Sequence, residues 1–246
     1  MKWTEKPLVR GIFVERLHRF GAKVIVRGRE EYCHVTNSGR LKELLFPGAQ
    51  VALVDHGGRF KTQNPKSKIR RKTRYAVRLA RFRKKWVCIE ANIAPKLLME
   101  AWKAGRIRDL KIYDRLKAEV PLNAHTRFDF QALDSKSGDR AWIEVKCVTL
   151  VDEKGTGRFP DAPSERASKH LKELMALSRK SRTKCFVFFV LQNPFGRAVA
   201  AKRDTDPLFA GMMDKAMRSK VVLKAFRAEV DLKGSRIIQP IPVLKS

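Results

Sequence analysis

Residues 126–150 read TRFDFQALDSKSGDRAWIEVKCVTL and predict two strands of a sheet. Apolar and polar side chains alternate along Thr126–Leu133 and again along Ala141–Leu150, as they do in β-strands. The residues between them, 134–140, include Asp, Ser and Gly, which are turn formers. We therefore expect the two strands to pair as a hairpin.

The two faces of the second strand differ in character. The face expected to meet the core consists of Ile143, Val145 and Cys147. The opposite face consists of Trp142, Glu144 and Lys146. Asp129, in the first strand, shares a face with Arg127 and Gln131. If the strands pair across the turn, Asp129 and Glu144 converge at the edge of the sheet with Lys146 beside them.

These residue types suit hydrolysis of a phosphodiester. Two carboxylates, Asp129 and Glu144, can bind Mg²⁺ or Mn²⁺, which lowers the pKa of a bound water and neutralises charge on the phosphate. Lys146 can hold the attacking water and stabilise the pentavalent state. Glu100, on a preceding predicted helix, can supply a further carboxylate. The predicted catalytic set is thus Glu100, Asp129, Glu144 and Lys146.

A second interpretation of the same pattern stays open. Glu and Lys two residues apart are common on exposed strands, where a cross-strand ion pair contributes only about 0–1 kcal/mol. On this interpretation Asp129, Glu144 and Lys146 lie on a solvent-exposed face of the sheet and have no catalytic role.

The charge balance points to a polyanionic partner. The chain has 246 residues, with 54 Lys and Arg against 25 Asp and Glu, and a formal net charge of +29. Such an excess repels itself in a compact protein. DNA is the expected partner and RNA the alternative.

Other classes of protein are disfavoured. No long uncharged stretch predicts a membrane span, and the N-terminus lacks the apolar segment of a secretory signal. The four cysteines, Cys33, Cys88, Cys147 and Cys185, form no CxxC pair, so no zinc ribbon or disulfide framework is indicated. We expect a cytoplasmic protein with buried thiols; the sequence leaves the oligomeric state open, a dimer included.

Residues 1–91 are expected to form a small β-barrel of the OB type. Five or six short strands follow one another between Val9 and Ala91, separated by turns such as Asn37–Arg40. Residues 59–85 hold thirteen Lys or Arg and no acid, with aromatic residues interleaved. This pattern favours a nucleic-acid surface over a solvated charge run. The candidate contacts on the barrel are Arg40, Arg70, Arg71, Lys72 and Arg74.

Residues 92–246 are expected to form a mixed α/β domain. The order is a helix near 95–103, three strands, a helix from Ser164, a buried strand at Cys185–Leu191, a helix and a last strand. Ser164 or Asp161 can cap the second helix. Arg166, Lys169 and His170 lie within one turn of it and are predicted to contact nucleic acid or to support the site.

The chain resembles the sugar fermentation stimulation protein A family over nearly its whole length. The most specific matches are RFDF (127–130), IEVKCVTL (143–150) and FPDAPSER (159–166) with Lys169-His170-Leu171. Further matches are HVTNSGR (34–40), PGA (47–49) and RKT (71–73). The chain departs from the family mildly at Ser38, Ser164 and Ala167, and its basic segment 61–72 is longer.

The resemblance implies an OB-like barrel followed by a PD-(D/E)xK nuclease-like α/β domain. It places Asp129, Glu144 and Lys146 on the nuclease motif and Glu100 on the acidic position of the first helix. It also implies DNA binding and a regulatory role in sugar utilisation. Two functions therefore remain: a metal-dependent nuclease, or a sequence-independent DNA-binding regulator with an inactive nuclease fold.

Overall fold

The computed structural model describes residues 1–3, 8–57 and 73–245. It divides into two compact units, one made of residues 1–91 with 230–235 and the other of 92–229 with 236–246. Within the described residues, no helix is long and apolar enough to cross a membrane.

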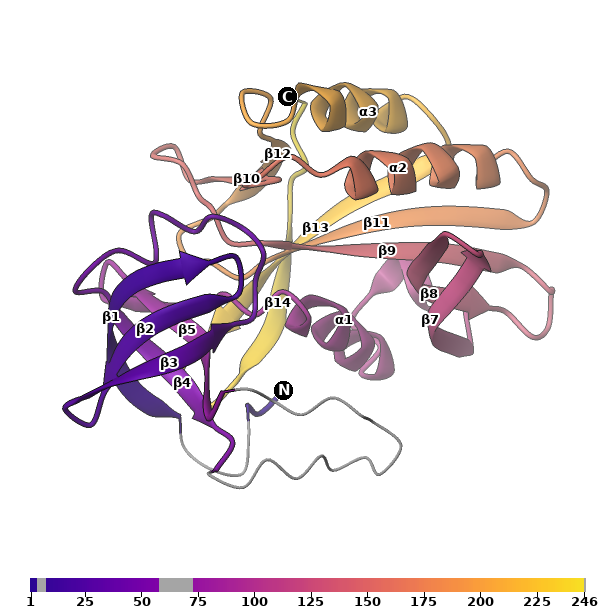
Figure 1. Ribbon diagram of the computed structural model, residues 1–246. Coiled ribbons are helices and arrows are strands. Elements are labelled where there is room, and N and C mark those ends of the chain that lie inside the picture. Colours follow the sequence, from indigo (N-terminus) through magenta and orange to yellow (C-terminus); the bar gives the residue numbers. More distant parts are fainter. Residues whose placement is uncertain (4–7, 58–72, 246) are drawn as a thin grey trace. The chain divides into compact units, whose positions relative to one another are not determined.

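The first unit is a closed barrel (Figure 1). Its strands are β1 (Val9–His18), β2 (Gly21–Val26), β3 (Arg29–Val35), β4 (Gln50–Asp55), β5 (Tyr75–Phe82) and β6 (Lys85–Cys88). They hydrogen-bond in the order β3-β2-β1-β4-β5-β6, and β3 also pairs with β5 in parallel, which closes the sheet on itself. Register shifts in β1 allow the strong curvature that closure requires.

Alternating side chains fill the barrel. Phe13, Val24, Val35, Leu53 and Val77 are each no more than 2% exposed and belong to one apolar cluster. The turn at residues 41–45 adds Leu41 and Leu44, both fully buried, to that cluster. The alternation that predicted these strands therefore reflects an inward and an outward face.

The second unit is a six-stranded mixed sheet between helices. Its helices are α1 (Ile93–Lys103), the 3₁₀ helix η1 (Arg108–Leu110), α2 (Glu165–Leu177) and α3 (Pro207–Met217). Its strands are β7 (Arg115–Asn123), β8 (Thr126–Leu133), β9 (Arg140–Val148), β10 (Thr156–Phe159), β11 (Thr183–Leu191), β12 (Ala198–Ala201), β13 (Val221–Val230) and β14 (Ser235–Ile241). The large sheet has the order β14-β13-β11-β9-β8-β7, and β10 pairs with β12 separately.

The helices cover both faces of this sheet. Figure 1 shows α2 and α3 on one face and α1 on the other. Strand β11 runs parallel to β9 and β13 and has seven buried residues in a row, as its continuous apolar sequence predicts. The sequence did not predict β10, β12 or β14. Strands β8 and β9 lie inside the sheet, between β11 and β7, so the expectation that Asp129 and Glu144 lie on strands at the edge of the sheet was wrong.

The four cysteines all lie within the described residues, and none of them forms a disulfide. Cys33, Cys88 and Cys185 are buried, as expected for small apolar side chains, whereas Cys147 is only half-buried and accepts a hydrogen bond from Gln192.

Asp206 joins the N-termini of α2 and α3. Its Oδ1 accepts from the N–H of Phe209 (2.8 Å), which caps α3, and its Oδ2 accepts from the N–H of Ser164 (2.8 Å). Ser164 in turn caps α2 by accepting from Ala167, as predicted. One buried carboxylate thus holds together the two helices on this face of the sheet.

We predict that Asp206→Ala lowers the free energy of unfolding by about 2–3 kcal/mol, because it removes a helix cap and leaves a buried N–H without an acceptor. Urea denaturation followed by circular dichroism measures this. Asp204→Ala is the control, because Asp204 is exposed and its ion pair is with nearby Lys202. Its loss is expected to cost less than about 0.5 kcal/mol. Equal stability of the two variants would contradict the role given to Asp206.

Candidate active site at the β8–β9 hairpin

Pairing between β8 and β9 stops at the residues of interest. The antiparallel register runs from Leu133 opposite Arg140 to Phe130 opposite Ile143 and is not continued beyond that pair. The next two residues in this register are Asp129 and Glu144. There the N–H of Val145 donates to a side chain instead of to a backbone carbonyl of β8: its acceptor is Oδ2 of Asp129 (2.6 Å). The hairpin predicted from the sequence is therefore present, and it splits at the two carboxylates.

Glu144 is the centre of a buried polar cluster. It is 5% exposed, and its Oε1 lies 2.5 Å from Lys146 Nζ and 2.7 Å from His170 Nδ1. The side chain of His170 is 3% exposed and that of Lys146 is 11% exposed. The solvated-face interpretation is thus not what the structure shows, since α2 covers this side of β9.

The electrostatics of the two carboxylates differ. Burial, followed by repulsion from Glu144, raises the pKa of Asp129 to about 7, and the hydrogen bond from Val145 only partly opposes this. Burial also acts to raise the pKa of Glu144, but Lys146 and His170 outweigh it and hold that pKa below its ordinary value. The cluster therefore keeps Glu144 ionised and leaves Asp129 near its titration point at neutral pH.

Packing of α2 against β8 and β9 fixes this arrangement. The ring of His170 lies against Phe128, with centroids 5.3 Å apart, and Phe128 in turn lies against Trp142 at 5.6 Å. Thr126 Oγ1 donates to Glu173 Oε1 (2.7 Å), which ties the start of β8 to α2. The apolar contacts set the position of the imidazole, and the imidazole sets the orientation of Glu144.

His170 has a different place from the one expected. The prediction grouped it with Arg166 and Lys169 as a nucleic-acid contact, but Arg166 and Lys169 are exposed and His170 is buried. Ala167, Leu171 and Leu174 are buried on the same helix. Positions 167, 170, 171 and 174 follow the i, i+3, i+4, i+7 spacing of one helix face, and this signal in the sequence could have placed His170 inward.

Glu100 is half-buried in α1. That helix packs against β9, on the opposite face of the sheet from α2 (Figure 1). Glu100 thus lies on a helix that packs against the same strand as Glu144, and its predicted part in catalysis stays a prediction.

The donor set bears on the predicted metal. Among the described residues, no group of three or more His, Cys, Asp and Glu side chains could hold an ion. The candidate ligands are therefore the two carboxylates of Asp129 and Glu144, of which Asp129 has its pKa raised to about 7. Their oxygens are hard donors. This pair suits Mg²⁺, which binds through one or two carboxylates, retains waters and accepts substrate phosphate oxygens, better than an ion that needs a full protein cage.

The basic candidates fall into three groups. Arg40, Arg166 and Lys169 are exposed. Arg74 forms a two-bond ion pair with Asp55 (3.0 and 2.9 Å) and lies over the ring of Tyr75, so its charge is already partnered. Arg70, Arg71 and Lys72 lie outside the described residues.

Other arginines next to aromatic rings serve the barrel itself. Arg78 is bonded to Glu90 (2.6 Å) and lies over Trp3, with both charged side chains largely buried. Arg81 lies over Trp86 and donates to Gln50. The aromatic and basic pattern that predicted a nucleic-acid surface is thus partly a pattern of internal contacts.

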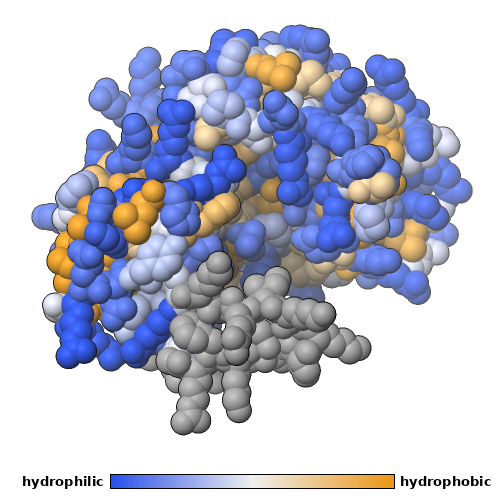
Figure 2. Space-filling view, in the orientation of Figure 1, coloured by the Kyte–Doolittle hydropathy of each residue, from blue (hydrophilic) through white to orange (hydrophobic). Residues whose placement is uncertain are grey.

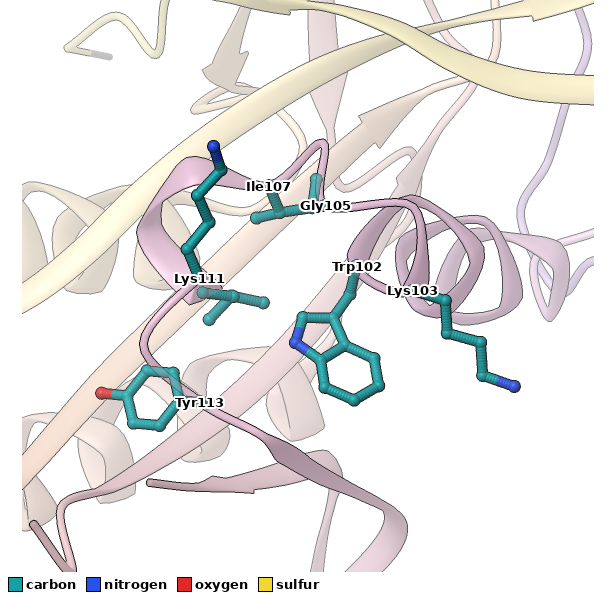
Figure 3. Close-up of a pocket in the computed structure, with 7 residues that line it drawn as sticks. Trp102, Lys103, Gly105, Ile107, Lys111 and Tyr113 are labelled. Atoms are coloured by element: carbon teal, nitrogen blue, oxygen red, sulfur yellow. The ribbon is translucent and has the colours of Figure 1, made fainter. Parts of the chain in front are cut away.

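A separate pocket of about 350 Å³ lies at the end of α1. Figure 3 shows the rings of Trp102 and Tyr113 bordering it, with Ile107 beside them, while the amino groups of Lys103 and Lys111 point away from each other. None of the residues clustered around Glu144 lines this pocket. The side chains that do line it bring no polar groups together toward a ligand.

Two family models match the chain. One, described as the sugar fermentation stimulation protein RE domain, matches residues 92–234, and the other, described as the SfsA N-terminal OB domain, matches residues 14–89. The chain belongs to the sugar fermentation stimulation protein (SfsA) family. The resemblance found in the sequence is therefore confirmed.

Individual relatives agree with this assignment. Sugar fermentation stimulation protein homologs of Desulforamulus reducens and Acetivibrio thermocellus are each 37% identical to the chain, over 96% and 98% of it and over 92% and 98% of their own lengths. The solved structure of Pyrococcus furiosus SfsA in complex with Ca²⁺ has a TM-score of 0.84 and 26% identity, and 99% of each chain is covered. The predicted fold class, an OB barrel followed by a mixed α/β domain, is confirmed for this SfsA-family chain.

The raised pKa of Asp129 predicts a pH dependence of stability. Between about pH 4 and pH 7 the folded protein holds a proton on Asp129 that the unfolded chain has lost, so this group makes folding less favourable as the pH rises. Asp129→Asn removes the effect. The wild type should therefore lose stability relative to the variant as the pH rises. Measured with a chelator present, the free energy of unfolding of the variant minus that of the wild type should increase by roughly 2–3 kcal/mol from pH 5 to pH 8.

Asp134→Asn is the matched control. The pKa of Asp134 is lowered by its hydrogen bond with Ser137, so its titration lies below this pH range and the corresponding difference should stay flat. Urea titrations at each pH provide the free energies. A flat difference for Asp129→Asn as well would show that Asp129 is ionised throughout.

Proposed function

We propose that this SfsA-family chain binds nucleic acid, DNA in the first place, and hydrolyses its phosphodiester bonds with Mg²⁺ or Mn²⁺. The observation that carries the proposal is the split of β8 from β9 at Asp129 and Glu144, with Lys146 Nζ 2.5 Å from Glu144. A PD-(D/E)xK nuclease-like domain uses an acid and an acid-x-lysine on adjacent strands, and these residues have that order.

Asp129 and Glu144 would hold the metal. Both are oxygen donors, Glu144 is kept ionised, and Asp129 is near its titration point, so a cation at this place would offset their repulsion. When bound, the ion would lower the pKa of a water and neutralise charge on the phosphate. The Pyrococcus furiosus SfsA structure is a complex with Ca²⁺, another hard cation, which is consistent with an oxygen site in the family.

The protein's own residues then have separate roles. His170 and Lys146 both contact Oε1 of Glu144, which orients the carboxylate and directs its other oxygen away from them. Lys146 has three N–H donors, of which Glu144 takes one among the described residues. The other two can hold the attacking water and a phosphate oxygen. Glu100 is the further candidate from α1.

Binding itself rests on charge. The chain has a net charge of +29, and Figure 2 shows a surface that is largely hydrophilic. The exposed cations Arg40, Arg166 and Lys169 are candidates for phosphate contacts, as are Arg70, Arg71 and Lys72 from the basic segment. RNA would satisfy the same charges, so the nucleic acid is identified by comparing probes.

A nucleic-acid-binding regulator without catalysis is the alternative function. It would keep the cationic surface and lose turnover, and it differs from the proposed enzyme only in the behaviour of the β8–β9 cluster. The catalytic proposal is favoured because the cluster is buried and polar, and a buried ion pair is poor support for stability alone.

We predict that Glu144→Gln and Lys146→Ala each reduce cleavage by about 100-fold or more without loss of nucleic-acid binding, because each removes a group that acts on the reacting phosphate. Supercoiled plasmid, linear duplex, single-stranded DNA and RNA are incubated with Mg²⁺ or Mn²⁺ and the products resolved on gels. Asp129→Asn and Glu100→Gln are tested in the same way.

Glu165→Gln is the matched control for Glu144→Gln. Glu165 is an exposed carboxylate in the first turn of α2, so the same chemical change there should leave cleavage unaltered. If the wild type cleaves none of the four substrates with either metal, the non-catalytic alternative replaces the nuclease. If cleavage is equal in all variants, it does not come from this site.

We also predict that affinity depends steeply on salt. Neutralising about six phosphates gives a slope near −5 in a plot of log K against log salt concentration. Fluorescence anisotropy between 50 and 200 mM salt, in chelator, measures the slope for several unrelated sequences. The double variant Arg166→Gln with Lys169→Gln should make it shallower by about two. A flat plot for the wild type would argue against a phosphate-backbone interface.

A further inference from the structure

One face of the barrel carries a group of exposed apolar side chains. They lie on the outer side of β1, β2 and β3 and in the turn between β1 and β2, and Figure 2 shows hydrophobic surface among hydrophilic atoms on the barrel. The exposed members are Ile12 (39%), Leu17 (44%), Phe20 (44%), Ile25 (41%) and Tyr32 (45%). We call this set with His18 and His34 the aromatic face. Exposed apolar side chains gathered on one face of a protein can mark a binding site.

The rings of the aromatic face are held in pairs. His18 Nε2 and Tyr32 Oη are 2.8 Å apart. Phe20 and His34 are stacked, with centroids 6.1 Å apart and planes 27° apart, and His34 Nδ1 lies 3.0 Å from the carbonyl oxygen of Phe20. Four rings from two strands and one turn therefore contact one another in pairs.

Gly21 explains how the rings lie. A Cβ at this position would be 2.7 Å from the Tyr32 hydroxyl and would also collide with His18. The His18–Tyr32 pair thus occupies the space that a side chain at position 21 of β2 would fill. Rings exposed on the surface of a strand can stack with the rings of a ligand.

Cations flank the aromatic face at both ends. Arg19, in the β1–β2 turn, and Arg40 are exposed. Arg16 Nη2 donates to the carbonyl oxygens of Asn37 (2.9 Å) and Gly39 (3.2 Å) as well as to that of Arg19, which keeps the turn and the loop before Arg40 together.

Exposed Arg27 and Arg29 stand at the other end of the same strands, around the β2–β3 turn. The two acids within the face, Glu15 and Glu30, both pair with Lys23 (3.1 and 3.4 Å). The remaining charge around the rings is therefore positive at each end of the face, which complements a polyanion.

We propose that the aromatic face binds the unpaired bases of single-stranded nucleic acid. This rests on the proposed function and deepens it, because it names the form of the substrate. Bases in a duplex are stacked on one another, whereas unpaired bases can stack on protein rings while flanking arginines contact phosphates. The outer strands 2 and 3 of an OB barrel are a place where such ligands bind.

The test compares probes and variants by fluorescence anisotropy, using the full chain in chelator so that no cleavage occurs. Phe20→Ala and Tyr32→Ala should each weaken binding of a labelled single strand by about fivefold or more, and change duplex affinity by less than about twofold. Tyr32→Phe keeps the ring and should bind like the wild type. Phe20→Leu keeps the bulk without the ring and should behave like Phe20→Ala.

Phe46→Ala is the matched control. Phe46 is 47% exposed on the same barrel, but it lies in the turn with Ala49 and not on β1–β3, so its removal should leave both affinities unchanged. The slope of affinity against salt should be the same in the ring variants and the wild type, because they keep all cations. Single strands with photoreactive uracil should cross-link to Phe20 or Tyr32.

Three results would overturn the proposal. The first is wild-type single-strand affinity in Phe20→Ala and Tyr32→Ala. The second is an equal loss for single strand and duplex. The third is a dimer that dissociates in these variants while nucleic-acid binding persists, which would assign the face to a second copy of the chain.

Failure of the proposed function gives a different outcome. If the wild type binds neither duplex nor single strand, nucleic-acid binding itself fails. If duplex binding and Glu144-dependent cleavage persist while the ring variants match the wild type, only the aromatic face is wrong.

Discussion

The hydrogen bond from the Val145 N–H to the Asp129 carboxylate is the interaction on which the site depends. Without it, the ladder between β8 and β9 would continue past Phe130 and Ile143, and the N–H would bond to a strand carbonyl. With it, a side chain terminates the ladder and holds one carboxylate beside Glu144. The same contact that ends the pairing therefore builds the pair of acids, so the fold of the hairpin and the chemistry of the site have a common origin.

Burial gives this cluster its character. An exposed Glu–Lys pair would contribute little to stability, whereas here Glu144 is 5% exposed and one of its carboxylate oxygens contacts both Lys146 and His170. Replacing buried ion pairs by apolar groups often costs no stability. The position of the cluster beside Asp129 is thus better explained by the site than by stability of the fold: burial and then Glu144 raise the pKa of Asp129 to about 7, although Lys146 opposes the rise.

Local periodicity carried most of the sequence-based prediction. Alternation of apolar and polar residues located β8 and β9, and the same rule located the barrel strands. Strands β10 and β12 are four residues each, too short to show a period, and β14 contains Pro240, which obscured it. For the polar face of β9 the sequence left open both a catalytic cluster and a solvated face. That His170 would cover Glu144 depends on how α2 packs, and the spacing of residues on one strand does not contain this long-range information.

The barrel shows why a charge count alone misjudges a binding surface. Arg74 and Arg78 belong to the sequence pattern that predicted nucleic-acid binding, yet Asp55 and Glu90 already partner them. Cations without such partners act on phosphates, which every nucleic acid has, and their effect is screened by salt. Rings act on bases, and only where bases are accessible. If the aromatic face binds as proposed, charge supplies affinity for any strand, and the rings supply the preference among strands that charge cannot provide.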